Sequence, residues 1–433
     1  MERVIKGPIG RGGEASRKFP PGFYPQFSRI ERRTYQRLQE LLVRPSVDLD
    51  LDALNVFLRV GTFVGTDTAF RHIKADAPDY EWAASIPRCE LNREQIIDAY
   101  IALFRSSIRR CNDEGKVSLP LSGGRDSRHI LFELYTQQRK PSLCWTVDIP
   151  WRPSEAIVAS CLCSRLDVPH QVLKLRGNLI AIESRKLKAT DFSSFQHAWM
   201  AEAVYNGMAN GHVIYDGIGG DVLSAGLFLS EKRVRLLNEG HIDELVEDIV
   251  GPNEKVFGVD DPTVFPRWRA VEKVSEEFRR HLNAPDPISS FYFWNRTRRD
   301  IGCSPFALLQ EKAKQVHTPY LDSEVVTFLA GLPPEITVDH HLHRDVIARG
   351  YPEFNDVPYA PPALKESEHG ISYFRKVAGV TLWYMMSRSC PVISRARVYG
   401  RLLRSLLSAK YAQEGFLLAP RIVYLTELFR SLE

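Results

Sequence analysis

The sequence predicts an α/β fold, in which a doubly wound parallel sheet lies between a small N-terminal segment and a mostly helical C-terminal region. Strand and helix signals alternate between residues 117 and 216. Apolar residues then recur at helical spacing over most of residues 230–433. An alternating order of strands and helices is typical of a parallel sheet that helices cover on both faces.

The elements of the sheet follow one long helix. Asn92 and Gln95 form the pattern of a capping box, and Gly115 marks the end of the helix that starts there. Apolar runs between turn residues then predict the strands, and apolar residues at helical spacing predict the helices. The expected strands are 117–121, 142–148, 171–175 and 212–216, and the expected helices are 127–138, 153–166 and 195–209.

The N-terminal part divides into two expected segments. Residues 1–22 combine glycines with arginines and lysines, which is the composition of a flexible basic arm. Residues 23–90 are expected to form a small separate segment, with a helix over 28–43 and short strands with turns over 56–80. Within the latter, β-branched and aromatic residues between glycines in 61–66 predict a hairpin.

The C-terminal part is expected to be helical. A main domain spans residues 91–390, and residues 391–433 form a basic helical tail that combines arginines with leucines. These arginines fit either an acidic partner surface or the solvated face of a packed helix. The expected helices are 232–249, 268–282, 322–331, 372–386 and 396–407.

Composition and charge narrow the classes of protein. The chain has 433 residues, of which 44% are hydrophobic and 25% charged, with a formal net charge of +4. These values allow two or three domains and favour neither nucleic acid nor a membrane as a partner. No apolar run approaches the roughly 18 residues that span a bilayer. The 7 cysteines are scattered and the N-terminus has no apolar signal core, so we expect a cytoplasmic protein.

One loop carries chemistry that the fold alone does not require. Ser122, Gly123 and Gly124 follow the first expected strand, and the next helix begins near Ser127. Ligands of open parallel sheets bind at this edge. Adjacent glycines let backbone N–H groups approach an anion, and the helix N-terminus adds further donors. The two serines can donate hydroxyl hydrogen bonds to phosphate oxygens.

Asp126 lies inside this candidate anion site. Its charge repels phosphate unless a divalent cation bridges the two groups, and Mg²⁺ commonly joins carboxylates to phosphate oxygens. The loop has no lysine of the Walker type, so it is not a standard P-loop. The residues therefore predict a site for a phosphate ligand and Mg²⁺. A glycine turn without a ligand is the alternative.

The segment L-S-G-G-R-D-S resembles the ATP-pyrophosphatase loop, S-G-G-x-D-S, of the asparagine synthetase family. The resemblance implies a sheet of the adenine-nucleotide alpha-hydrolase-like type that binds ATP and Mg²⁺. It implies that the loop holds pyrophosphate and that the backbone near two strand ends contacts adenine. The residues that it assigns to the nucleotide here are Leu121, Ser122, Gly123, Gly124, Asp126, Ser127 and Val147.

A second loop, with the sequence Y-D-G-I-G-G-D, follows the fourth expected strand. It resembles the acidic loop S-G-E-G-x-D-E of the same family in Gly217, Gly219 and Asp221. It departs from that pattern at Ile218 and Val222, which stand where the family has glutamates. The resemblance implies that Asp221 is a second Mg²⁺ ligand and that the two glycines lie at the nucleotide. A glycine turn with a capping aspartate is the alternative.

Further matches to the family are looser. Residues 318–322, T-P-Y-L-D, resemble its R-x-P-F-L-D segment, which sets a helix against the nucleotide domain. Of its K-x-x-L-R segment, His340 stands in place of the lysine and Arg344 is kept. Lys365, in a stretch that follows R-x-K-x-G-F loosely, is the candidate for the lysine that stabilises the adenylate and the departing pyrophosphate. A solvated loop lysine is the alternative.

Residues 61–70 resemble the last hairpin of the family's glutaminase domain, but the rest of that domain is missing. The family's nucleophile is a cysteine directly after the initiator methionine, and the residue at that position here is Glu2. The resemblance therefore implies no hydrolysis of glutamine on this chain.

The resemblance implies an ATP-dependent amide ligase that forms AMP and pyrophosphate. A substrate carboxylate is activated as an acyl-adenylate, and an amine or ammonia then attacks the acyl carbon. The catalytic residues would be Asp126, Asp221 and Lys365. Asp191, Glu202 and Tyr205 lie in the stretch where a general base is expected, and the sequence does not choose among them.

The source of the nitrogen stays open. It is free ammonia in an asparagine synthetase-like enzyme, a small-molecule amine in an amide synthetase, or a peptide amine in a macrolactam cyclase of the lasso-peptide type. A sulfur-transfer pyrophosphatase would use the same loop with a reactive cysteine, for which Cys144 is the candidate. The substitutions at Ile218, Val222 and His340 also fit a non-catalytic ATP-binding homologue.

Overall fold

The computed structural model describes residues 27–29, 33–35, 48–175, 178–189, 192, 198–252, 263–299, 312–360 and 368–431. Its central element is a five-stranded sheet with the strand order β6-β5-β4-β7-β8. Every strand runs parallel to its neighbours. The strands are β4 (Val117–Pro120), β5 (Leu143–Asp148), β6 (His170–Lys174), β7 (Val213–Tyr215) and β8 (Gln315–His317).

The chain begins this sheet in the middle and reverses direction once. It passes from β4 through α4 (Asp126–Thr136) to β5, and through α5 (Pro153–Leu166) to β6. It then returns to the other side of β4 through α6 (Leu179–Ala189) and α7 (Ala198–Tyr205). Right-handed crossovers with one reversal place helices on both faces of a sheet. The predicted α/β class with a parallel sheet is confirmed.

The burial of each strand follows its position in the sheet. The central strands β4 and β7 are buried at almost every residue, and the edge strand β6 is largely exposed. All four predicted strands exist, with ends shifted by no more than a few residues. The sequence missed β8, since this strand has only 3 residues, of which one is apolar. β8 is therefore defined by its pairing with β7 and not by an apolar run in its own sequence.

The start of α3 (Arg93–Arg109) is confirmed as a capping box. The Asn92 side chain accepts a hydrogen bond from the Gln95 N–H at 3.0 Å, and the Gln95 side chain accepts one from the Asn92 N–H at 3.1 Å. This exchange satisfies two donors that a helix N-terminus otherwise leaves unpaired.

The remaining elements are mostly helical, as predicted. The expected helix over 232–249 is two helices, because Gly240 adopts a left-handed conformation with a φ of 76° between them. The helical tail expected over 391–433 contains the last helix, whose bounds the sequence did not predict; Pro420 lies inside this helix, although proline usually ends one. The further elements are α2 (Tyr80–Ser85), α8 (Gly220–Ser224), α9 (Glu231–Asn238), α10 (Ile242–Val250), α11 (Arg267–Arg279), α12 (Pro287–Tyr292), the π-helical turn η5 (Phe293–Thr297), the 3-10 turns η6 (Pro319–Leu321), η7 (Pro352–Phe354) and η8 (Ala409–Tyr411), α15 (Ser323–Ala330), α16 (Pro334–Thr337), α17 (Leu342–Gly350), α18 (Glu368–Met386), α19 (Arg395–Leu407) and α20 (Ala412–Arg430).

The predicted helix over residues 28–43 is wrong where the structure describes it. β1 (Phe27–Arg29) and β2 (Arg33–Tyr35) are antiparallel strands, and β3 (Ile73–Ala75) pairs with the other side of β1. The third strand lies about forty residues away along the chain, so local periodicity could not reveal the pairing. Residues 36–43 lie outside the described part of the chain.

The expected strands over 56–80 are also wrong in their first part. Residues Leu51–Val60 form helix α1, whose N-terminus is capped by Asp50. Gly61 ends the helix with a left-handed φ of 88°. The predicted hairpin over 61–66 is therefore a helix end followed by turns. Glycines on both sides of a short apolar run are typical of a hairpin, but the first of these glycines ends a helix.

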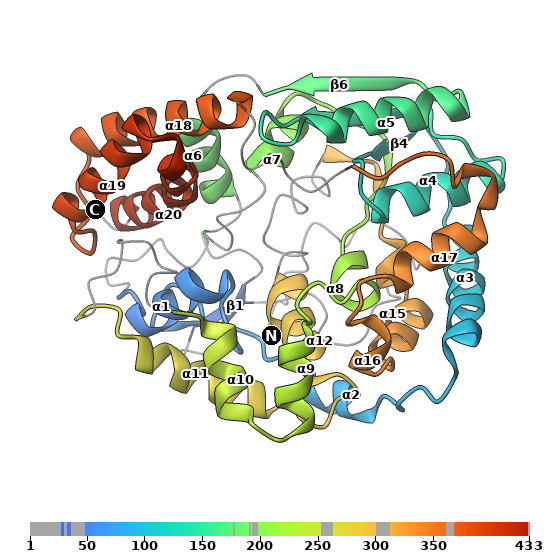
Figure 1. Cartoon of the computed structure of the whole chain (residues 1–433), viewed down its shortest axis with the longest axis horizontal. Helices are drawn as coiled ribbons and strands as arrows, with labels where there is room; N and C mark the ends of the chain where they lie inside the picture. Colours follow the sequence, from blue (N-terminus) through green and yellow to red (C-terminus); the bar gives the residue numbers. More distant parts are fainter. Residues whose placement is uncertain are drawn as a thin grey trace.

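The N-terminal and C-terminal segments share a hydrophobic core. The Phe57 ring of α1 packs on the Tyr424 ring of α20, with centroids 4.7 Å apart. α18, α19 and α20 lie together beside α6, and α1 lies beside α10 and α11 (Figure 1). No helix in the described ranges has both the length and the apolar character needed to cross a bilayer.

Asn295, in the π-helical turn, ties the N-terminal segment to the body of the protein. Its side-chain oxygen accepts a hydrogen bond from the Gly65 N–H at 2.6 Å, and its amide donates to Glu277 at 3.1 Å. Its main-chain oxygen accepts a bond from the Thr62 hydroxyl at 2.5 Å. Asn295 is completely buried. The loop that was predicted as a hairpin is therefore held by side-chain bonds and not by a strand ladder.

Asn295→Ala should lower the free energy of unfolding by about 2 to 4 kcal/mol, because it leaves the buried Gly65 N–H without its partner and removes one of the hydrogen bonds to the buried Glu277 carboxylate. Urea denaturation measures the loss. Asn355→Ala is the matched control, since the exposed Asn355 amide makes one hydrogen bond, to the Ala348 carbonyl at 3.2 Å. Equal, small effects of the two substitutions would show that Asn295 does not anchor the segment.

Candidate functional site

The two loops that the sequence singled out meet at the carboxyl edge of the sheet. One follows β4 and the other follows β7, and these strands are neighbours at the point where the strand order reverses. Open parallel sheets bind ligands at such a point. The loops are in direct contact, since a Cβ atom on Gly217 would lie 2.9 Å from the Cβ of Asp126. The structure therefore brings the predicted residues of both loops together.

The first loop is organised by its own serines. The Ser122 N–H donates to the Ser127 hydroxyl at 3.1 Å, and the Gly124 N–H donates to the Ser122 hydroxyl at 3.1 Å. α4 starts at Asp126, and the residue before it makes no capping side-chain bond. The first N–H groups of α4 thus keep their capacity to bind an anion.

Gly123 is enclosed by two parts of the chain that the sequence did not connect to it. Its N–H donates to the Glu155 carboxylate of α5 at 2.6 Å, and its carbonyl accepts a bond from the Ala360 N–H at 3.1 Å. A Cβ atom here would lie 2.5 Å from the Cβ of Ala360, so only glycine fits. Sequence reasoning missed Glu155, because nothing in its local pattern distinguishes it from an ordinary acidic residue in a first helical turn.

The buried Arg128 holds the segment that ends at Ala360. Its guanidinium donates to the Val357 carbonyl at 2.9 Å and to the Pro358 carbonyl at 2.7 Å, and it lies 3.9 Å from the Tyr359 ring centroid. Residues 357–360 therefore form a wall of the first loop. Lys365 lies outside the described residues, in the stretch that follows this wall.

The second loop requires glycine for steric reasons. Gly219 has a φ of 87°, and a Cβ atom on it would lie 2.5 Å from Leu321. A Cβ atom on Gly220 would lie 2.8 Å from the carboxylate of Asp126. Asp216 closes the turn by accepting a bond from the Ile218 N–H at 2.8 Å. Burial, with the nearby charge of Asp126, raises the pKa of Asp216 to about 6.

Asp126 and Asp221 interact through their charges. Burial raises the pKa of Asp221, the Arg296 guanidinium opposes this, and the Asp126 carboxylate adds to it. Both side chains reach the surface, with exposed fractions of 32% for Asp126 and 40% for Asp221. Within the described ranges no three histidine, cysteine or acidic side chains group to hold a metal. Two carboxylates suit Mg²⁺ when phosphate oxygens and water supply the other ligands.

A buried pair of histidines supports Asp126 from below. The Nδ1 atom of His343, in α17, lies 3.3 Å from the Asp126 carboxylate and 3.0 Å from the Ser224 hydroxyl of α8. Its Nε2 atom lies 3.1 Å from Nδ1 of His129 in α4. The Tyr320 hydroxyl donates to the Asp126 carbonyl at 2.9 Å. Asp126 is therefore contacted by α17 and η6, and His343 links it to Ser224 of α8.

One assignment of hydrogens satisfies most of this network. His129 donates from Nδ1 to Nε2 of His343, which leaves Nδ1 of His343 to donate to Ser224 or Asp126. The Ser224 hydroxyl donates to the Gly220 carbonyl. Burial, with the neighbouring His343, lowers the pKa of His129 well below 6.5, which agrees with an Nε2 atom that has no hydrogen-bond partner among the described residues. The network thus joins α4 to the loop after β7.

The residues expected to contact adenine lie in the sheet itself. The Leu121 N–H donates to the Trp145 carbonyl at 2.8 Å, and the Leu121 carbonyl accepts a bond from the Thr146 hydroxyl at 2.7 Å. Val147 is buried and pairs with Leu173 of β6. The carbonyl of Leu121 keeps a second lone pair at the strand end, but its N–H is already engaged.

The candidate general bases are not brought into the site by the described contacts. Asp191 lies outside the described residues, as does the side chain of Glu202. The Tyr205 ring of α7 packs under the Arg185 guanidinium of α6, whose Cζ atom lies 3.7 Å from the ring centroid. Cys144 is buried, and hydrogen bonding to Cys163 with burial raises the pKa of its thiol, which does not suit a nucleophile.

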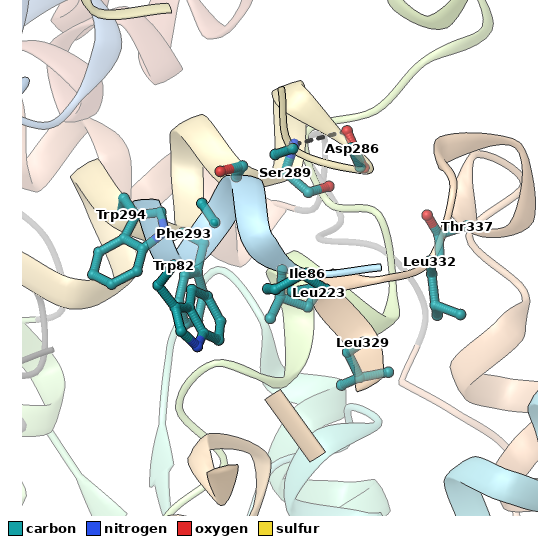
Figure 2. A pocket seen from close by; sticks show the side chains of 14 residues that line it. Trp82, Ile86, Leu223, Asp286, Ser289, Phe293, Trp294, Leu329, Leu332 and Thr337 are labelled. Carbon is teal, nitrogen blue, oxygen red and sulfur yellow. Dashed lines mark hydrogen bonds between the residues drawn. The ribbon is translucent and has the colours of Figure 1, made fainter. Parts of the chain in front are cut away.

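An enclosed cavity lies behind α8 and is separate from the two loops. Figure 2 shows Trp82, Trp294 and Leu223 among the apolar side chains that line it. The volume open to the centre of a water molecule is about 10 Å³. This is room for about one water and too little for a metabolite. Asp286 lies on its wall and caps α12 by accepting two backbone N–H bonds at 3.0 Å.

The comparisons with known proteins do not add to the motif resemblance. No protein-family model and no curated protein sequence matches the chain. The functional assignment therefore rests on the geometry of the two loops and on the sequence motifs that they carry.

His343→Leu should lower the free energy of unfolding by about 2 to 4 kcal/mol, because it leaves Asp126, Ser224 and His129 without a shared buried partner. Chemical denaturation measures the loss. His343→Gln should recover part of it, since an amide can also donate and accept. His241→Leu, at an exposed histidine in the N-cap position of α10, is the control and should change stability by little. A loss no larger than in the control would remove His343 from its supporting role.

Asp286 should give the protein a measurable pH dependence. Burial raises its pKa from the ordinary value of 3.8 to about 6, so the folded state holds a proton that the unfolded state releases between these values. Raising the pH from 4 to 7 should lower the stability of the wild type relative to Asp286→Asn by about 2 to 3 kcal/mol, with little further change above about pH 7. Urea denaturation of both proteins from pH 4 to 8 tests this, and parallel curves would contradict it.

Proposed function

We propose that this protein is an ATP-dependent amide ligase that forms AMP and pyrophosphate. The observation that carries the proposal is the contact between the loop Ser122–Ser127 and the loop that leads to Asp221, at the reversal point of a parallel sheet. The strand order, with β4 between β5 and β7, supports a sheet of the adenine-nucleotide alpha-hydrolase-like type. A cytoplasmic location is part of the same proposal.

The donors of the first loop suit a pyrophosphate group. The hydroxyls of Ser122 and Ser127 lie 3.3 Å apart and face the same N-terminal turn of α4. The helix dipole and the free N–H groups of that turn favour negative charge. The glycine positions allow the backbone to approach closely, since side chains there would meet Ala360 or Asp126. The loop can thus bind phosphate oxygens without a Walker lysine.

Asp126 and Asp221 would hold Mg²⁺ in this proposal. Their mutual repulsion in the described state is what a divalent cation relieves, because it binds carboxylates and phosphate oxygens together. The bound ion would supply charge neutralisation for the nucleotide. The proposal needs both carboxylates, since they are the candidate metal ligands of the two loops.

The reaction joins a carboxylate to an amine in two steps. A carboxylate oxygen attacks the α-phosphorus of ATP, a new P–O bond forms, and the bond to the β-phosphate bridging oxygen breaks with release of pyrophosphate. An amine or ammonia then attacks the acyl carbon, loses a proton and displaces AMP. The loop amides, the α4 N-terminus and a cation stabilise the negative charge that develops on the departing pyrophosphate.

Lys365 is the proposed cation for this step. Ala360 contacts Gly123, so the chain enters the stretch that contains Lys365 directly beside the phosphate-binding loop. The position of Lys365 in the sequence, shortly after this contact, supports the role.

The acceptor nitrogen belongs to ammonia, a small-molecule amine or a peptide, as in lasso-peptide macrolactam cyclases. One observation favours a second candidate function, a non-catalytic ATP-binding homologue. The Glu155 carboxylate takes the Gly123 N–H at 2.6 Å, and it brings a negative charge to the proposed phosphate site. An enzyme would have to neutralise or displace that carboxylate during each cycle.

Incubation with ATP, Mg²⁺, pooled carboxylates and amines should release AMP and pyrophosphate in equal amounts. Asp126→Asn should reduce this release at least about a hundredfold, because it removes a charge that binds Mg²⁺. Asp243→Asn, at a surface residue of α10 that is 83% exposed, is the control and should retain full activity.

The products distinguish the candidate functions. Formation of ADP and phosphate would contradict adenylation, and ATP binding without turnover would favour the non-catalytic homologue. Unchanged turnover in Asp126→Asn would contradict the metal assignment. Calorimetric titration of the protein with ATP in the presence of Mg²⁺ measures nucleotide binding without any carboxylate or amine substrate.

A further inference from the structure

The π-helical turn η5 brings a cation to the loop that leads to Asp221. A π-helical turn has a wider backbone ring than an α-helix, and such turns are frequent at functional sites. η5 continues directly from α12 and is fixed by Asn295, whose side chain bonds to the N-terminal segment. The next residue, Arg296, lies against the second loop, with its Nη1 atom 3.9 Å from the Asp221 carboxylate.

The side chain of Arg296 is largely shielded from solvent. Its side chain is 17% exposed, and its Cζ atom lies 5.4 Å from the centroid of the Phe228 ring. That ring is itself stacked on Tyr292, with centroids 3.7 Å apart. A partly desolvated guanidinium beside an aromatic ring interacts more strongly with anions than one in bulk water.

Thr297 brings the same turn into contact with the glycines of the loop. A Cβ atom on Gly219 would lie 3.8 Å from the Thr297 methyl group. Thr297 is 2% exposed, and its hydroxyl has no hydrogen-bond partner among the described residues. A buried hydroxyl without a partner is uncommon in folded proteins and indicates a group that a ligand or water completes.

The distance between Arg296 and Asp221 is long for an ion pair that only stabilises the fold. A bidentate arginine–carboxylate pair has N–O distances of about 2.7–2.9 Å. At 3.9 Å the guanidinium reduces the repulsion between Asp221 and Asp126 without forming a direct hydrogen bond. A divalent cation between the two carboxylates would perform the same task with twice the charge, and it would compete with Arg296 for Asp221.

We propose that Arg296 is a binding residue for the pyrophosphate part of ATP, and that it exchanges Asp221 for these phosphates when the metal binds. This inference rests on the proposed function. The planar fork of arginine suits two phosphate oxygens, and the mobility needed is small because the guanidinium already lies beside the metal-binding carboxylate. Arg296 of η5 and the N-terminus of α4 would then both contact the pyrophosphate.

Calorimetric titrations of Arg296→Gln test the exchange with two probes. With pyrophosphate at saturating Mg²⁺, the variant should bind at least about tenfold more weakly than the wild type, since it lacks a charge-assisted hydrogen bond. With Mn²⁺ alone, it should bind as tightly as the wild type or about threefold more tightly, because a competing positive charge beside Asp221 is gone. A purely structural role would weaken both.

Two further variants complete the test. Arg296→Lys keeps the charge without the fork and should bind Mg²⁺–pyrophosphate with intermediate affinity. Arg279→Gln, at a half-exposed arginine of α11 paired with Asp243, is the matched control and should bind both probes as the wild type does. Thermal unfolding of each variant checks that the fold is intact.

The outcomes separate this inference from the proposed function. Wild-type binding of Mg²⁺–pyrophosphate with an unchanged affinity in Arg296→Gln would overturn the role of Arg296 and leave the proposed function standing. Loss of Mn²⁺ binding in that variant would overturn the exchange of partners. A wild-type protein that binds neither ATP nor pyrophosphate with Mg²⁺ would overturn both.

Discussion

The contact between His343 and Asp126 is the constraint on which the candidate site depends. His343 lies completely buried between α4, α8 and η6, and its two ring nitrogens contact Asp126, Ser224 and His129. Each of these partners belongs to an element that starts or supports one of the two loops. Because buried polar groups are costly to leave unpaired, the network has few alternative arrangements. It thereby fixes the distance between a carboxylate that follows β4 and a loop that follows β7.

This support allows the two loops to approach more closely than side chains would permit. Gly217 and Gly220 lie against Asp126, and Gly219 lies against Leu321, with no space for a Cβ atom. The result is a region where the charge of Asp126 acts on both the buried Asp216 and Asp221 and raises the pKa of each. Helix α4 directs its N-terminus into the same region, and Arg296 faces it from η5. Repelling carboxylates beside hydrogen-bond donors that bind anions suit a metal–phosphate ligand, because the metal binds the carboxylates and the phosphate binds the donors.

The parts of the fold that the sequence predicted correctly are those with local causes. The four predicted strands and the capping box at Asn92 follow from apolar runs and from hydrogen bonds between residues three apart. Two errors have local causes, the missed helix α1 and the break at Gly240, and the others fall where the cause is remote. β1 pairs with the distant β3 as well as with β2, and the loop after Gly61 is held by Asn295, which lies more than two hundred residues away. β8 likewise exists because β7 offers it an edge.

For the site, the sequence by itself identified Ser122 to Ser127, Gly217, Gly219 and Asp221, since each belongs to a short motif whose chemistry is readable from adjacent residues. It predicted a phosphate-type loop after the first strand of a parallel sheet, and the parallel sheet is confirmed. Only the tertiary structure decided that the two loops touch, that His343 and Ser224 hold them together, and that Glu155, Arg128 and Arg296 surround them. These five side chains come from separate elements. Their proximity depends on how the helices pack around the sheet, and their spacing along the chain does not predict it.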